Sequence, residues 1–198
     1  MKNSIVSYCN IKNNQVFLNG EKIFHDEEAS EFLEFIKKAY KHFELDYPKF
    51  YKMDSLCKLA MVGGSVLLNQ LDEVDSEMAL VFSNKSSCID IDRIHQASIS
   101  ENEGYASPAN FVYTLPNIAL GEISIKYKLR SENSFFIFED FNPSFLIDYT
   151  TSLINLNKAE QVLCGWIEVF ENEYNAFLFI AKEAEGLTLN KENLLKLI

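Results

Sequence analysis

Residues Ser107–Ser131 read SPANFVYTLPNIALGEISIKYKLRS, and this stretch says more about the fold than any other part of the chain. A helix is predicted within 113–125, beginning after Pro116, because proline suits the start of a helix but not its interior. The next apolar run, NSFFIF (Asn133–Phe138), predicts a strand that other elements cover on both faces. The segment therefore indicates a helix that leads into a buried strand.

The flanking sequence predicts further helices with clear start signals. Asn142 followed by Pro143 opens a helix, with asparagine as the cap and proline at the first helical position. Asp54 can cap another helix, which contains Gly63 and Gly64 and therefore indicates close packing against a neighbouring element. Hydrophobic patterning predicts the remaining helices at 27–43 and 191–197 and the remaining strands at 4–9, 15–18, 77–82, 161–167 and 176–181. Strands that alternate with helices favour an α/β fold with a layered, mostly parallel mixed sheet flanked by helices.

Composition limits the classes of partner. The 198 residues include 18 basic and 29 acidic side chains, a net charge of −11, which disfavours binding to nucleic acid or to anionic membrane surfaces. Membrane insertion is not expected, because the sequence has no run of about 18 uncharged apolar residues. The four cysteines stand singly, without metal-ligand spacing, so we expect no metal or other cofactor and a reduced, cytoplasmic protein.

Several blocks in order resemble the N-terminal half of β-ketoacyl synthases, enzymes of the thiolase fold. The block FYKMD (Phe50–Asp54) and the SLCKLAMVGGSVLL that follows it resemble a helix of that half. MALVFSNKSSCIDIDRIHQ resembles its second core strand and the following loop, and AEQVLCGWIEV, from Ala159, resembles a later strand. The resemblance implies a single domain over residues 1–198, best matched over 50–169, that corresponds to one thiolase-like half.

The resemblance also locates the family's nucleophilic cysteine, which would lie at the start of the helix opened by Asn142. Counting back from the AEQVLCGWIEV block puts the position at Asp140, within two residues, and the stretch FEDFNPS contains no thiol. A carboxylate at Asp140 suits a helix N-terminus but cannot form an acyl thioester. Ser144 is the one nearby hydroxyl, and no base stands beside it. The chain is therefore expected to be inactive in condensation on its own.

Histidines offer no clear replacement for the missing chemistry. The family places its catalytic histidines in the C-terminal half, whereas His25, His42 and His95 all precede the nucleophile position. His95 follows Cys88 by seven residues, with Asp90 and Asp92 between them, so a Cys-His-Asp arrangement competes with an ordinary surface helix or loop. Cys164 falls in a predicted buried strand, where a packing thiol is expected.

The resemblance further implies partners. In thiolase-fold enzymes the strand before the nucleophile pairs antiparallel with the same strand of a second subunit, and here that strand is predicted to consist of Asn133, Ser134, Phe135, Phe136, Ile137 and Phe138. A homodimer, or a heterodimer with a ketosynthase, would form through this strand. An acyl carrier protein could contact Lys126, Lys128 and Arg130 at a strand end, although a solvated edge is the competing interpretation.

Two functions remain open at this point. The first is a non-condensing, ketosynthase-like accessory or binding protein, a pseudoenzyme comparable to chain-length-factor subunits, in fatty acid, polyketide or aryl-polyene-type biosynthesis. The second is a hydrolase or thioesterase that acts on acyl-carrier thioesters with Asp140 or Glu139 as the base. The amide-rich start of a helix favours the charged carboxylate and so makes a weak base, which favours the first function.

Overall fold

The chain begins with antiparallel hairpins. The computed structural model describes residues 2–101 and 104–198. The first strands are β1 (Asn3–Lys12), β2 (Gln15–Leu18) and β3 (Glu21–His25). Asn13 and Asn14 both adopt positive φ angles, 51° and 55°, in the turn between β1 and β2. Asparagine tolerates this conformation well, so these two residues suit the tight turn that joins the strands.

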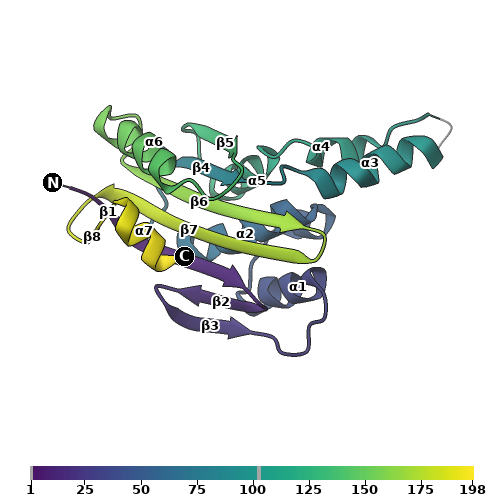
Figure 1. Cartoon of the computed structure of the whole chain (residues 1–198), viewed down its shortest axis with the longest axis horizontal. Helices are drawn as coiled ribbons and strands as arrows, with labels where there is room; N and C mark the ends of the chain where they lie inside the picture. The colour runs from purple at the N-terminus through teal and green to yellow at the C-terminus, as the bar shows by residue number, and fades with distance from the viewer. Residues whose placement is uncertain (1, 102–103) are drawn as a thin grey trace.

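All strands join one mixed sheet in the order β3-β2-β1-β7-β6-β4-β5, with β8 paired to β1 (Figure 1). The remaining strands are β4 (Ala79–Asn84), β5 (Asn133–Ile137), β6 (Gln161–Phe170), β7 (Glu173–Glu183) and β8 (Leu187–Thr188). The only parallel pairs in the described sheet are β4 with β5 and β4 with β6. The predicted layered α/β fold is confirmed, but the expectation of mostly parallel strands is wrong. Tight turns join several successive strands, and such turns permit only antiparallel pairing.

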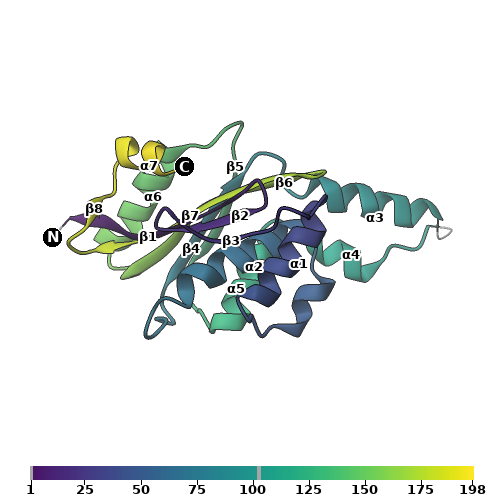
Figure 2. The same ribbon diagram turned by 90° about the horizontal axis from the view of Figure 1, so that it is seen from below.

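Helices cover both faces of the sheet (Figure 2). One face carries α1 (Phe32–His42), the 3-10 helix η1 (Pro48–Lys52), α2 (Ser55–Leu68) and α5 (Ile118–Tyr127). The other face carries α6 (Pro143–Asn155) and α7 (Lys191–Leu197). Two buried apolar clusters follow this division, the first formed with α1, α2 and α5 and the second with α6 and α7. The remaining helices, α3 (Ile89–Glu101) and α4 (Pro108–Tyr113), form an arm that extends beyond the sheet.

The start of α2 follows the local chemistry of its sequence. The Asp54 carboxylate accepts hydrogen bonds from the backbone N–H groups of Leu56 and Cys57, at 3.2 and 3.1 Å, so the predicted cap is confirmed. A Cβ atom at Gly63 would lie 2.9 Å from Leu178 Cδ1, and one at Gly64 would lie 3.0 Å from Ile123 Cδ1. The glycine pair therefore permits the close packing of α2 between the sheet and α5, as expected.

The NSFFIF strand, β5, lies at the edge of the sheet. It is the last strand of the sheet and has β4 as its neighbour on one side. Its three central side chains are half-buried, and Asn133 and Ile137 are exposed. Phe135 packs against the first apolar cluster and Phe136 against the second, so both faces of the strand are partly covered, as expected. The apolar pattern of a strand indicates that its side chains can be buried, but it does not indicate whether another strand pairs beyond it.

Candidate functional site

The outer edge of β5 offers unpaired backbone groups. Leu80 N donates to Glu132 O at 2.9 Å, and Phe138 N donates to Asn84 O at 2.9 Å. Backbone groups of successive strand residues point to opposite sides, so the even-numbered residues of β5 face β4. The odd-numbered residues Asn133, Phe135 and Ile137 then point their N–H and C=O groups outward. This edge is available to another strand.

The start of α6 lies just beyond β5 and is capped by Asn142, whose side-chain oxygen accepts a hydrogen bond from Phe145 N at 3.1 Å. Asp140 lies in the loop before this cap, and its side chain is exposed, as is that of Glu139. Asn142 thus caps the helix as predicted, and Asp140 lies two residues before this cap. Ser144 is also exposed, within the first turn. The described residues around this helix start include no thiol.

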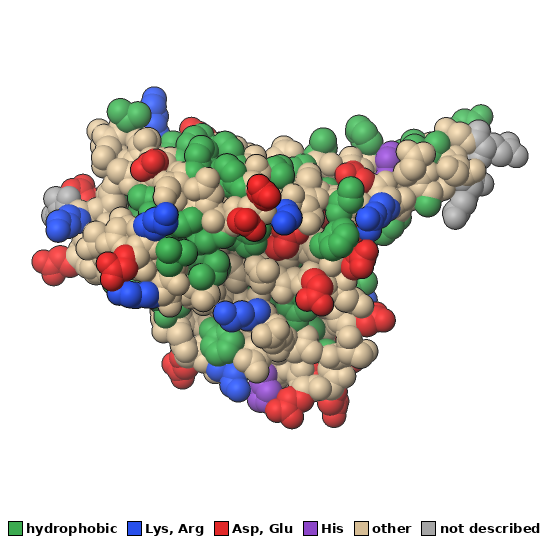
Figure 3. Space-filling model, in the orientation of Figure 1, with side chains coloured by type: hydrophobic (Ala, Val, Ile, Leu, Met, Phe, Trp, Pro, Cys, Tyr) green, Lys and Arg blue, Asp and Glu red, His purple; other side chains and the backbone are tan. Residues whose placement is uncertain are grey.

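Aromatic side chains fill the space between β5 and α6. Phe136 makes edge-to-face contacts with Phe145 and Tyr149, at centroid distances of 4.7 and 5.1 Å. Phe138 contacts Phe145 at 5.0 Å, and Phe141 contacts Trp166 at 6.1 Å. Figure 3 shows hydrophobic side chains gathered on this part of the surface, with charged side chains around them. The region where the family would place its nucleophile is thus an aromatic surface.

The histidines do not form the arrangement that the Cys-His-Asp hypothesis requires. The His95 ring packs against Phe111, with the centroids 5.7 Å apart, while Asp90 accepts a hydrogen bond from Glu171 N at 2.7 Å. Cys88 is buried immediately before α3, about 10 Å along the helix axis from His95. His25 lies 3.6 Å from Glu27, and His42 packs on Phe24.

All four cysteines are buried, and their surroundings disfavour the thiolate. Burial raises the pKa of Cys164 to about 12, and it raises the pKa of Cys9, Cys57 and Cys88 above the ordinary thiol value. Cys164 lies in β6, so the expected packing thiol is confirmed. The thiolate is the reactive form of cysteine, and burial at these four positions disfavours it.

We therefore expect the native protein to be nearly inert to a thiol reagent such as DTNB at about pH 8, with labelling no faster than global unfolding. In denaturant all four thiols should react. Stopped-flow absorbance with and without denaturant measures both rates. A thiol that reacts within the mixing time under native conditions would contradict this expectation and would reveal a poised nucleophile.

The three basic residues considered for carrier binding lie around the end of α5, not at a strand end. Lys126 Nζ donates to Asp46 O at 3.3 Å and lies 5.9 Å from the centre of the Tyr47 ring. Lys128 adopts a left-handed conformation at the end of the helix, and its side chain, like that of Arg130, is exposed. The helix simply continues past Ile125, where the sequence pattern predicted its end. Lys126 thus makes contacts within the chain, whereas Lys128 and Arg130 are exposed to solvent.

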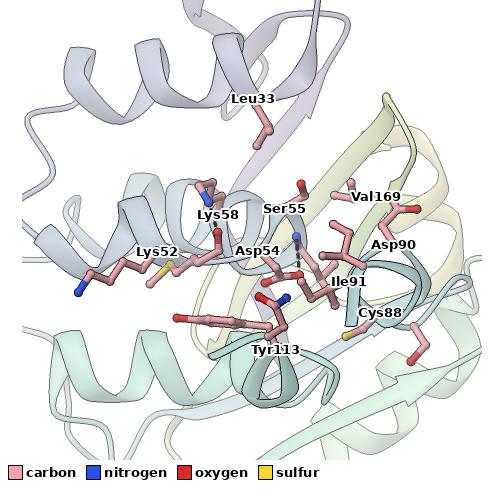
Figure 4. A pocket seen from close by; sticks show the side chains of 15 residues that line it. Leu33, Lys52, Asp54, Ser55, Lys58, Cys88, Asp90, Ile91, Tyr113 and Val169 are labelled. Carbon is pink, nitrogen blue, oxygen red and sulfur yellow. Dashed lines mark hydrogen bonds between the residues drawn. The ribbon is translucent and has the colours of Figure 1, made fainter. Parts of the chain in front are cut away.

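A cavity of about 280 Å³ opens between α1, α2, α3 and α4 (Figure 4). Its polar lining includes Asp54, Asn110 and Tyr113, and Cys88 lies beside them. Burial, followed by the nearby carboxylate of Glu122, raises the pKa of Tyr113 to about 12. From the sequence, Asp54 is recognisable only as a helix cap and not as part of a cavity wall. No local pattern signals it, because its walls come from elements far apart in the chain.

No group of three or more histidine, cysteine, aspartate or glutamate side chains within residues 2–101 and 104–198 is placed to hold a metal ion. In the same part of the chain, no helix has both the length and the apolar character needed to cross a bilayer.

Comparison with known proteins identifies the fold. No protein-family model matches the chain, and no curated protein matches its sequence. A structure titled the ishigamide ketosynthase/chain length factor has a TM-score of 0.69 and 16% identity, over 93% of this chain and 63% of that one. A ketosynthase (ApeO) in complex with its chain length factor (ApeC), from Xenorhabdus doucetiae, has a TM-score of 0.61 and 13% identity, over 93% of this chain and 80% of that one.

A β-ketoacyl synthase from Burkholderia phymatum gives a TM-score of 0.57 and 12% identity, over 93% of this chain and 59% of that one. The chain thus spans less than two thirds of the length of the first of these three structures. The shared arrangement of a mixed sheet with helices on both faces extends over nearly all of the present chain. The chain therefore has the thiolase-like fold of ketosynthases and chain length factors.

Proposed function

We propose that this protein is a non-condensing accessory subunit that pairs with a ketosynthase through β5. One observation carries the proposal. Within the described residues, an open strand edge lies beside a start of α6 that has no thiol. An accessory subunit needs the pairing edge but not the nucleophile. The fold shared with ketosynthase/chain length factor structures supports this role.

The biosynthetic setting follows from the same likeness. The titles of the similar structures name chain length factors and, in another case, an acyl-carrier protein in complex with its ketosynthase. We infer that the present chain takes part in the synthesis of polyketide, fatty acid or aryl-polyene-type chains. The paired ketosynthase would supply the catalytic cysteine and histidines. Lys128 and Arg130 are the exposed basic residues that remain candidates for contact with the acidic carrier protein.

Pairing with a different chain also agrees with the charge. Two copies of this chain would bring together two molecules of net charge −11, and Glu132, Glu139 and Asp140 are exposed beside the pairing edge. Like charges at an interface disfavour association. A ketosynthase with basic residues around its own edge strand would complement this surface. We therefore propose a heterodimer rather than a homodimer.

The experiment combines the purified chain with a candidate ketosynthase and acylated or malonylated carrier protein. Light scattering after size exclusion should show a one-to-one complex with the ketosynthase, and intact mass should show no acyl adduct on the present chain. Free thiol released from carrier thioesters should not rise when this chain is incubated alone. A strict monomer that ignores the ketosynthase would refute the pairing. Steady thiol release that is lost in Asp140→Asn or Glu139→Gln would support the hydrolase instead.

A further inference from the structure

The cavity between α1, α2, α3 and α4 has no part in the proposed accessory role, and its lining is mostly apolar. Six aliphatic apolar residues line it together with several polar groups, and the cavity measures about 280 Å³. The aliphatic lining residues are Leu33, Met53, Leu56, Ile91, Ile94 and Val169. Leu33 and Ile94 are exposed to 41% and 56%, whereas Leu56 and Val169 are buried. The cavity thus has an apolar floor and an apolar, solvent-exposed mouth.

Asp54 brings a carboxylate into this lining. Figure 4 shows its side chain in the middle of the cavity wall, with Tyr113 on one side and Ile91 on the other. The two backbone N–H groups that it caps and the Cys57 thiol occupy much of its acceptor capacity, since a carboxylate accepts about four hydrogen bonds. The remaining lone pairs are available to a group within the cavity.

The lysines around the cavity do not neutralise this carboxylate. The Lys58 ammonium donates its hydrogen bond to the backbone carbonyl of Met53, and the Lys52 side chain extends away from Asp54 in Figure 4. Asp54 forms no ion pair with any residue in 2–101 or 104–198 at salt-bridge distance. Burial raises the pKa of Asp54, although its hydrogen bonds and the charge of Lys58 oppose this effect. A largely buried carboxylate whose nearest named cation, Lys58, acts on it without a salt bridge is costly, and a cation in the cavity would offset that cost.

The other charged groups near the cavity form no ion pair with Asp54 among the described residues. Asp90 also lines the cavity, and it accepts the N–H of Glu171 while Arg93 lies 4.0 Å from it on the same helix. Asn110 adds an amide oxygen that can accept a hydrogen bond, and Tyr113 adds the face of its ring. The cavity therefore combines apolar walls with the Asp54 carboxylate, which has no salt-bridge partner among the described residues.

We propose that this cavity is a binding site for a small molecule that carries a primary ammonium group on an aromatic or branched apolar body. The ammonium group donates to Asp54, and the body packs between Leu56, Ile91 and Val169. The volume fits such a molecule, because an apolar cavity of about 150 Å³ already holds benzene. The remaining space accommodates a short arm and the ammonium group. The site is independent of the β5 edge and of the proposed pairing with a ketosynthase.

Benzylamine is a suitable probe, and Asp54→Asn is the decisive variant. Asparagine caps a helix about as well as aspartate, so the variant keeps the fold but loses the charge. Isothermal titration calorimetry should detect benzylamine binding at millimolar concentration, and Asp54→Asn should weaken the binding at least about tenfold, as expected for a charge-assisted hydrogen bond. Asp140→Asn, which removes an exposed carboxylate elsewhere, should leave the binding unchanged. Circular dichroism confirms the fold of both variants.

Two further measurements locate the site and test the role of charge. In ¹⁵N NMR spectra the side-chain amide of Asn110 should shift on titration with benzylamine, whereas that of Asn142 at the start of α6 should not. Benzyl alcohol, a neutral molecule of the same shape, should bind at least about tenfold more weakly than benzylamine. Absence of benzylamine binding, equal binding to Asp54→Asn, or equal binding of benzyl alcohol would each overturn the proposal.

Discussion

Replacement of Gly165 by alanine is expected to prevent folding. Gly165 is buried in β6, where it pairs with Leu178 of β7, and its φ angle is +155°. A Cβ atom at this position would lie 2.1 Å from Phe177 O and 2.9 Å from Leu178 Cα. Both atoms belong to the backbone of a central strand and cannot move without breaking the pairing. The cost should exceed about 4 kcal/mol, a large part of the stability of an ordinary domain.

Gly121→Ala is the matched control. Gly121 lies within α5, and a Cβ atom built there meets nothing within 4 Å. Alanine is favoured over glycine inside a helix, so this variant should gain about 0.5–1 kcal/mol. Soluble yield and urea unfolding followed by circular dichroism compare the two variants. A Gly165→Ala protein that unfolds at the same urea concentration as the wild type would show that β6 and β7 do not pair as described.

Sequence reasoning succeeded where a structural feature depends on a few adjacent residues. Asp54 at the start of α2 and the Asn142–Pro143 pair at the start of α6 each satisfy backbone groups within three residues of their own position. Such hydrogen bonds need no information about the rest of the chain. The paired Gly63 and Gly64 also indicated a close approach, because few other circumstances favour two glycines within a helix.

Sequence reasoning failed where the outcome depends on distant neighbours. The apolar side chains of β5 are compatible with a central strand or with an edge strand, and only the sheet order separates these cases. The direction of the strands depends on which of the connections are tight turns. The sheet order also depends on β7, which lies between β1 and β6 and falls outside the part of the sequence that resembles the family. The cavity beside Asp54 arises from four helices and a strand end, so no single segment indicates it.

The proposed pairing through β5 gives the second large effect, and Ile137→Pro tests it. The N–H of Ile137 points away from β4, so proline at this position removes a donor from the outer edge while the hydrogen bond from Phe138 N to Asn84 O remains. The matching acceptor of a partner strand would be left unsatisfied, and the proline ring would crowd it. Association with the ketosynthase should weaken about tenfold to a hundredfold, as measured by sedimentation or biolayer interferometry.

Two controls separate lost pairing from lost folding. Ile137→Val keeps both the N–H group and the branched side chain, and it should bind the ketosynthase like the wild type. Phe136→Pro instead removes an N–H group that faces β4, so it should lower the unfolding midpoint, whereas Ile137→Pro should keep it close to the wild-type value. If Ile137→Pro folds and still binds with unchanged affinity, the partner does not add a strand at β5. The interface would then have to lie on another surface, and the accessory role would lose its main structural support.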